Sequence, residues 1–322
     1  MAADAQDRPR VSERQGLAGL LGSIAGDHPD RPGLTDGETS LTWGAVAEAV
    51  RAGRGPATGA LGRVLEVLGE LGSGSVVRFG DATDPLSGQS DMGFAIERDG
   101  AHEVLCHASA DAAHLGAALA RREALTADDR VALAARPEDP GFWPVLAACL
   151  ASGAQLDLSA ELKAATTAWL LEPGAVADYR PAPGLARLHL RTGRAHLTEV
   201  AEALPGTRLV NGLTLPETFG LALTSDPRDP AATVVATCGR PLGGIEVMVV
   251  DPRTGMDVLL YQTGEVWLRG AGVFQGYAGR PGAGFTDRFF RTGVLGHLDS
   301  EGRLVLPEVE EVALVRSWSL PD

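Results

Sequence analysis

The spacing of apolar residues along the first two thirds of the chain predicts helices that alternate with short strands. Apolar residues recur at helical spacing from Leu17 to Ile24, and Asp36-Gly37 marks a turn between two short strands. Thr42 stands where an N-cap is expected, before a helix that runs to Val50. The pattern also predicts helices over 61–74, 110–122, 141–152 and 198–203, and strands over 75–80, 92–96, 103–106, 130–134, 154–158, 186–190 and 207–210.

Segment 166–171 is a short apolar run whose spacing fits either a strand or a helix. The strand–helix alternation as a whole predicts α/β layers with a parallel sheet. After about residue 230 the helical spacing disappears, and strands and turns follow one another, with turns at 251–255 and 299–302. Residues 265–269 alternate like one face of a sheet. We therefore expect an α/β region over 1–229 and a β-rich subdomain over 230–322.

Composition narrows the class of protein. The chain has 322 residues, of which 44% are hydrophobic and 22% charged, so it can bury a sizeable core and is not a disordered chain. Its formal net charge of -14 weighs against a nucleic-acid or membrane-surface role. The three cysteines show no CxxC pairing, so we predict neither a disulfide framework nor a metal site. With no signal-peptide pattern and no membrane-length apolar run, we expect a cytoplasmic protein.

Lysine is almost missing from the chain. Lys163 is the single lysine, so 27 of the 28 basic residues are arginine. A GC-rich genome explains this bias, because alanine, glycine and proline are abundant as well. The chemical consequence holds in either case, since any mechanism that needs a lysine has one candidate.

Four segments in the last third of the chain carry a family resemblance. They read NGLTLPETFG (211–220), GRPLGGIEVMVVDPRTG (239–255), GEVWLRGAGVFQGYAGRP (264–281) and FFRTGVLGHLDSEGRLVL (289–306). In order and spacing they resemble the motifs of the adenylate-forming superfamily, which contains acyl-CoA synthetases, nonribosomal-peptide adenylation domains and luciferases. Weaker similarity extends over 31–50, 125–158 and 185–212. The resemblance implies the family's large N-terminal domain, with layered α/β sheets and a small distorted β-barrel-like subdomain.

The chain departs from the family where ATP is bound. The family's phosphate loop, rich in Ser, Thr and Gly and closed by Lys, is expected before the helix that starts near residue 110. Segment 94–116 holds no lysine, and Gly100 is the one glycine between its ends. Glu97, Asp99 and Glu103 add negative charge there, which opposes binding of a triphosphate.

Two further nucleotide motifs are altered. Leu, Thr and Pro replace the Tyr, Gly and Thr that precede the family's magnesium-binding Glu, and Glu217 alone is kept. A lone carboxylate of this kind is more typical of a solvated or paired surface group than of a metal ligand. In the RTGVL segment, Val294 replaces the aspartate that the family uses to hold the ribose hydroxyls, and a valine accepts no hydrogen bond. Arg291 is kept. Glu217, Arg291 and Val294 are thus a vestigial nucleotide site.

The resemblance also implies missing parts. The family's smaller C-terminal domain, which carries the adenylation lysine, would follow the hinge, whereas the chain ends soon after Pro307. About thirty residues separate Val46 from Arg78, where the family has a much longer strand–helix stretch. We expect a truncated member that has lost the C-terminal lid domain.

These losses predict a pseudoenzyme that no longer adenylates a carboxylate and needs no cofactor. It would bind a small acyl or aromatic substrate, an acyl-carrier protein or another enzyme of a natural-product pathway, such as polyketide assembly. Two alternatives stay open. One is a repurposed enzyme that uses the old acyl cleft for other chemistry. The other is a residual ligase that uses ATP and magnesium.

Candidate site residues follow from the resemblance and from local clusters. The acyl side of the family's cleft would be lined by Phe142, Trp143, His189, Thr192, Gly193, Asn211, Gly212 and Leu213. For Phe142 and Trp143, packing in the core is the competing interpretation, and His189 fits a strand face better than a base. His102, Cys106, His107, Glu217 and His297 are weak catalytic candidates, since their spacing matches no strong template.

Overall fold

The computed structural model describes residues 15–53, 58–81, 86, 92–98, 103–159, 167–170, 187–190, 194–203 and 206–307. In these residues a seven-stranded sheet runs in the order β10-β9-β8-β6-β7-β1-β2. The strands from β10 to β1 are parallel, and β2 is an antiparallel edge. Their bounds are β1 Pro32–Thr35, β2 Ser40–Thr42, β6 Arg130–Ala134, β7 Gln155–Asp157, β8 Thr167–Leu170, β9 Arg187–Leu190 and β10 Arg208–Val210.

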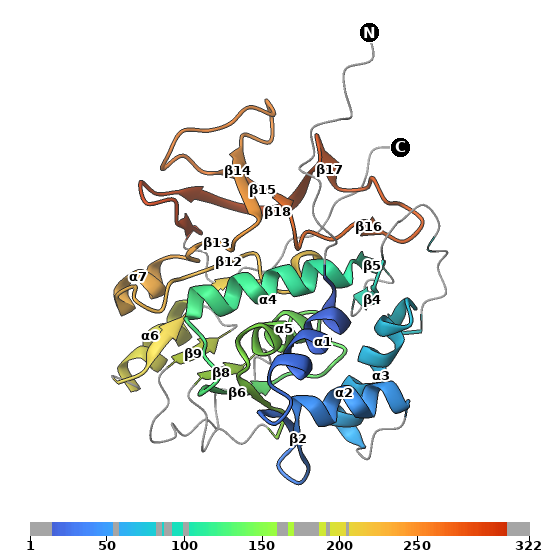
Figure 1. The fold of residues 1–322 in the computed structure, drawn as a ribbon. Coiled ribbons are helices and arrows are strands. Elements are labelled where there is room, and N and C mark those ends of the chain that lie inside the picture. The colour runs from blue at the N-terminus through green and yellow to red at the C-terminus, as the bar shows by residue number, and fades with distance from the viewer. Residues whose placement is uncertain are drawn as a thin grey trace.

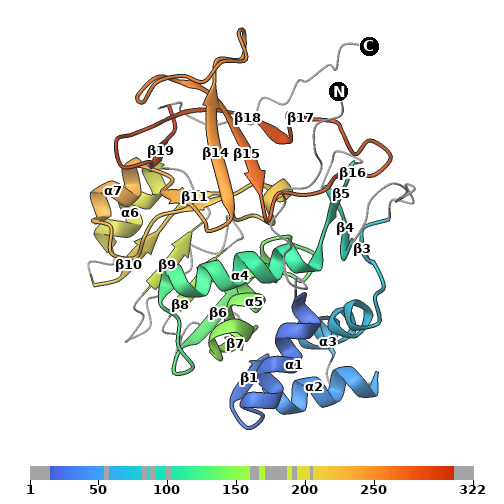
Figure 2. The ribbon, with the colours of Figure 1, turned by 45° about the horizontal axis from the view of Figure 1, so that its top comes forward.

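Helices surround this sheet, and α4 occupies the middle of the molecule. It lies beside α5 and separates the seven-stranded sheet from the strands of the last third of the chain (Figures 1 and 2). Gly116 of α4 faces Ala147 of α5, and a Cβ added at Gly116 would lie 2.3 Å from that of Ala147. The helices are α1 Leu17–Asp27, α2 Trp43–Ala52, α3 Gly59–Gly72, α4 Ser109–Glu123, α5 Phe142–Ser152, α6 Arg194–Ala203 and α7 Ala231–Ala236.

Three smaller sheets build the rest of the described structure. One is β11-β12-β13, and a second is β14-β15-β18-β17 with β19 paired to β18. The third, in the order β16-β5-β4-β3, joins strands from distant parts of the chain, because Tyr277 of β16 pairs with Leu105 of β5. The bounds are β3 Val77–Phe79, β4 Phe94–Arg98, β5 Glu103–His107, β11 Gly212–Leu213, β12 Leu223–Thr224, β13 Arg240–Pro241, β14 Ile245–Val250, β15 Gly264–Gly270, β16 Gly276–Tyr277, β17 Phe285–Thr286, β18 Phe289–Leu298 and β19 Leu304–Val305.

Most local predictions agree with this structure. Thr42 caps α2, since its side chain accepts a hydrogen bond from the Ala45 amide. The ambiguous run over 166–171 forms strand β8, which pairs on both sides in the parallel sheet. The strands predicted over 92–96 and 103–106 are β4 and β5, and they pair as an antiparallel hairpin. Within the described residues, none of the helices is long and apolar enough to cross a bilayer.

Two predictions for the last third are wrong. Residues 231–236, expected as strand, form helix α7, and the Asn211 amide donates to the carbonyls of Val234 and Thr237 at its end. Strand β15 does not alternate between buried and exposed positions, because both of its faces are covered from Gly264 to Leu268. Glu265 is buried there, and its charge is paired with Arg291, a contact that a one-strand pattern does not reveal.

The α4–α5 contact gives a stability test. Replacing Gly116 by alanine forces the two helices apart, so the free energy of unfolding should fall by about 1–3 kcal/mol. Gly22 of α1 is the matched control, since a Cβ there meets nothing within 4 Å. Gly22→Ala should leave stability unchanged or raise it by up to ~1 kcal/mol. Denaturant unfolding of both variants measures the difference, and equal stability would contradict the tight contact.

Candidate functional site

The β4–β5 hairpin stands where the phosphate loop was expected. Its strands pair in register from Phe94↔His107 to Arg98↔Glu103. Four residues, 99–102, therefore join the two strands. The side chains at the mouth of the hairpin also bind each other, because Arg98 Nη1 donates to Glu103 Oε2 at 2.8 Å. The hairpin is thus closed by an ion pair at its last register position.

Glu217 is buried beside this hairpin. It lies in the short 3-10 helix η2, Pro216–Thr218, and has no exposed surface. Its Oε1 accepts a hydrogen bond from Arg98 and a second one, at 3.0 Å, from the Tyr277 hydroxyl. Burial, followed by the charge of Glu217, raises the pKa of Tyr277 to about 12, so the phenol keeps the proton that it donates. The expectation that Glu217 is a surface group is wrong: it is paired, but in the interior.

A second ion pair extends this cluster toward solvent. Arg280 Nη2 donates to Glu103 Oε1 at 3.0 Å, so Glu103 lies between two guanidinium groups. Both guanidinium groups also lie over the Tyr277 ring, 5.6 Å (Arg98) and 5.7 Å (Arg280) from its centroid. The negative charge predicted at Glu103 is therefore matched by the two arginines.

A cluster of aromatic side chains packs against the end of η2. Phe219, which ends η2 in the left-handed region at φ 51°, packs edge-on against Phe94 of β4 and 4.0 Å from the His107 ring. Trp143 lies 5.1 Å from both Phe94 and Phe142, measured between ring centroids. Phe142 and Trp143, predicted to line an acyl cleft, thus lie fully buried in this packed cluster.

His107 is neutral in the folded protein. Its ring is completely buried, and burial lowers its pKa from 6.5 to about 3, an effect that the backbone of Pro216 only partly opposes. Cys106 is also buried, and its strand position pairs with Gly276 of β16. His107 and Cys106 are neighbours on β5, so their side chains point to opposite faces of the strand. His102, the third member of the predicted cluster, lies outside the described residues.

The other described residues of the predicted acyl side lie in two separate places, beside β12 and beside α4. Asn211 and the β11 residues Gly212 and Leu213 lie beside β12, where a Cβ at Gly212 would meet the Leu223 carbonyl oxygen at 2.1 Å. His189 of β9 is buried, with Nε2 3.3 Å from Glu123 Oε2 of α4. Thr192 and Gly193 lie outside the described residues.

The RTGVL segment forms part of β18. Arg291 lies over the Trp267 ring and pairs with the buried Glu265 at 3.2 Å. Val294 is buried in the core, and its amide donates to Thr292 Oγ1. His297 is partly exposed, near the Tyr261 ring at 6.1 Å. Arg291 is thus committed to a carboxylate of the neighbouring strand, and Val294 to packing.

Sequence reasoning missed three residues of this arrangement: Arg98, Tyr277 and Phe219. Arg98 carried a usable signal, because an arginine and a glutamate flank a four-residue turn. Tyr277 lies within the quoted GYAGRP segment, but nothing local marks it as a partner of Glu217. The structure brings the two together through the pairing of β16 with β5.

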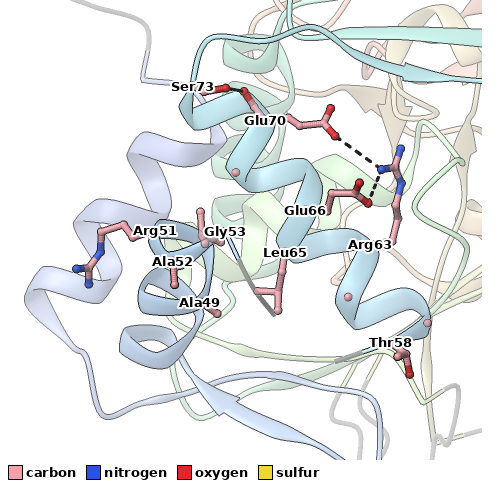
Figure 3. Close-up of a pocket in the computed structure, with 14 residues that line it drawn as sticks. Ala49, Arg51, Ala52, Gly53, Thr58, Arg63, Leu65, Glu66, Glu70 and Ser73 are labelled. Atoms are coloured by element: carbon pink, nitrogen blue, oxygen red, sulfur yellow. Dashed lines mark hydrogen bonds and ion pairs between the residues drawn. The ribbon is translucent and has the colours of Figure 1, made fainter. Parts of the chain in front are cut away.

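A hollow of about 840 Å³ lies elsewhere, between α2 and α3 (Figure 3). Small residues such as Ala49, Ala52 and Gly69 line part of it. The Arg63 side chain turns toward Glu66, 2.7 Å away, and toward Glu70 at 3.9 Å (Figure 3). The hollow contains none of the predicted site residues.

Comparisons with known proteins match this fold and these motifs. The AMP-binding enzyme family model matches residues 190–278. The Arabidopsis thaliana peroxisomal OPC-8:0-CoA ligase 1 is 30% identical over 125 residues, which are 37% of this chain and 23% of that protein. The Bacillus subtilis putative acyl–CoA ligase YdaB is 32% identical over 100 residues, 30% of this chain and 20% of that protein. The chain therefore matches about a fifth to a quarter of the length of these relatives.

Solved structures agree over most of the chain. The crystal structure of VinN has a TM-score of 0.74 at 16% identity and covers 91% of this chain and 99% of that one. The Bacillus subtilis o-succinylbenzoate CoA synthetase in complex with the acyl-adenylate OSB-AMP has a TM-score of 0.74 at 16% identity and covers 89% and 98%. The chain therefore has the fold of the large domain of adenylate-forming enzymes, and its segment 190–278 is similar to the AMP-binding enzyme family. The predicted α/β fold of the superfamily's large domain is confirmed.

Within this adenylate-forming fold, the matched segment 190–278 contains both Glu217 and Tyr277. The β4–β5 hairpin and Arg98 lie outside it. The superfamily motif around Glu217 is thus joined to a part of the chain that the family model does not match.

The buried imidazole gives a pH test. The pKa of His107 is lower in the folded protein than in the unfolded chain, so its contribution to stability is present above about pH 6.5 and is lost as the pH falls toward 3. In His107→Leu, the free energy of unfolding should depend less on pH over this range, by up to ~1.4 kcal/mol per pH unit. Denaturant unfolding at several pH values measures it. His28→Gln, at an exposed position, is the control, and a wild-type slope in His107→Leu would contradict the assignment.

Proposed function

We propose that this chain is a ligase-like binding protein that no longer adenylates carboxylates with ATP. In this proposal it holds an acyl or aromatic group, free or presented by an acyl-carrier protein or partner enzyme, in a natural-product pathway. The observation that carries the proposal is the β4–β5 hairpin. Its register leaves residues 99–102 as the whole connection where a phosphate-wrapping loop is expected.

A phosphate loop works through several backbone N–H groups that converge on the anion. A lysine that closes such a loop is missing from segment 94–116, which contains the hairpin. Arg98 does not compensate, since its guanidinium group is committed to Glu103 and Glu217. In this proposal a triphosphate finds neither a lysine nor an uncommitted Arg98 at the hairpin.

The positions expected to hold the ribose and the magnesium ion, Val294 and Glu217, also support the loss of nucleotide binding. Val294 offers no acceptor to ribose hydroxyls and packs in the core. Glu217 is buried against Arg98 and Tyr277, so its Oε1 is already an acceptor for two protein donors. The residues present do not fit a magnesium–nucleotide, and we derive no step through one.

An acyl group as the ligand is supported by the names of the relatives. OPC-8:0-CoA ligase 1 and several 4-coumarate–CoA ligase-like proteins are among them, and an o-succinylbenzoate CoA synthetase structure holds the product analogue OSB-NCoA. Asn211, Gly212 and Leu213 remain our proposed contacts for an acyl group, beside β12.

The first test is nucleotide binding by the purified chain. Titration with MgATP should leave its melting temperature unchanged and give no calorimetric heat of binding. A ligand at one hundred times its Kd would stabilise the fold by ~2.7 kcal/mol, so binding would be visible. Carboxylate-dependent exchange of pyrophosphate into ATP should also be absent. Saturable MgATP binding together with exchange would overturn the proposal in favour of a residual ligase.

The second test is acyl binding without nucleotide. Thermal shifts are measured with aliphatic and aromatic acyl-CoA and acyl-pantetheine thioesters, with unacylated CoA and pantetheine as matched controls. We expect saturable stabilisation by at least one thioester and none by the control ligands. Stabilisation by CoA alone, or by no thioester of the panel, would argue against an acyl-binding role.

A further inference from the structure

The cluster around Glu217 connects three segments that are far apart in the sequence. Arg98 comes from β4, Glu217 from η2, and Tyr277 from β16. Arg98 Nη2 contacts both of the other two, since it donates to Glu217 Oε1 and lies 3.2 Å from the Tyr277 hydroxyl. Glu103 and Arg280 complete the cluster at its outer side. Its two cationic and two anionic groups balance one another.

Burial makes this balance necessary. The Glu217 side chain is 0% exposed and that of Arg98 is 15% exposed. A carboxylate in such a place needs a cation or several hydrogen-bond donors beside it, because water no longer solvates its charge. The guanidinium group of Arg98 is the cation that the structure provides, and it also lies between Glu217 and Glu103.

We propose that Arg98 is a built-in cation that permanently takes the position of a metal ion at Glu217. It thereby holds β4–β5, η2 and β16 together without any ligand. The inference rests on the proposed loss of ATP chemistry. A divalent cation at Glu217 would have to sit beside the Arg98 guanidinium, and like charges at contact distance repel one another in a buried site. The arginine and the metal ion therefore exclude each other.

The proposal predicts what happens when Arg98 is removed. Arg98→Ala leaves the carboxylates of Glu103 and Glu217 on either side of the vacated space, with Arg280 still paired to Oε1 of Glu103 and Oε2 of Glu103 released. Carboxylate oxygens are the ligands that hard divalent cations prefer. The variant should therefore lose stability and gain a site for Mn²⁺ or Mg²⁺ that the wild type lacks.

The experiment compares melting temperatures with and without MnCl₂ or MgCl₂, with NaCl at equal ionic strength as the salt control. Wild type should not respond to either divalent cation. Arg98→Ala should melt lower by about 5 °C or more, and Mn²⁺ should restore part of this loss with a saturable dependence. Arg98→Ala/Glu217→Gln should melt higher than Arg98→Ala without metal and should show no rescue by Mn²⁺.

Arg269→Ala is the matched control, because it removes an arginine from an exposed ion pair with Glu246. It should change the melting temperature little and show no response to Mn²⁺. If Arg98→Ala fails to fold, the double variant should still fold, because Glu217→Gln removes the unpaired buried charge, and failure of the double variant as well would overturn the proposal. Wild-type stability of Arg98→Ala, absence of Mn²⁺ rescue, or rescue that persists in the double variant would each overturn the proposal.

The outcomes also separate this inference from the proposed function. MgATP binding by wild type would overturn the proposed function whatever the metal titrations give. Absence of Mn²⁺ rescue without any ATP binding would overturn the role of Arg98 alone.

Discussion

A buried carboxylate must be neutralised where it lies, and that constraint at Glu217 organises the centre of this molecule. The charge is met by Arg98, and the same oxygen accepts the Tyr277 hydroxyl. The pairing of β16 with β5 brings these groups together. Through it, a strand from the last third of the chain forms one edge of the sheet β16-β5-β4-β3. Leaving such a charge without partners would destabilise the folded protein by several kcal/mol.

Close packing supplies the rest of the framework. The α4–α5 contact permits no side chain at Gly116, and the aromatic cluster of Phe94, Trp143 and Phe219 fills the space beneath η2. These contacts are apolar and non-directional, and they do not depend on the identity of the nucleotide-binding residues. A fold can therefore keep its core while the polar residues next to it change.

The altered positions share one physical feature: each is satisfied within the protein. Val294 packs in the core, and Arg291 is paired with the buried Glu265. Glu103 lies between Arg98 and Arg280. A site that binds an ionic ligand keeps polar groups that only the ligand completes. Here Arg291 pairs with Glu265, and Glu103 pairs with both Arg98 and Arg280.

Local patterns in the sequence determined most of the elements, because the periods of helices and strands are visible within ten or fifteen residues. They also predicted the resemblance to the adenylate-forming superfamily, through four motifs in order, and the departures from it at the phosphate loop, Val294 and Pro216, since each is a matter of residue identity. The tertiary structure alone decided that residues 231–236 are a helix and that Glu265 and Glu217 are buried. The partner of Glu217 lies 119 residues earlier and its hydrogen-bond donor 60 residues later. No local pattern encodes such distances, because they arise from strand pairing and shared burial.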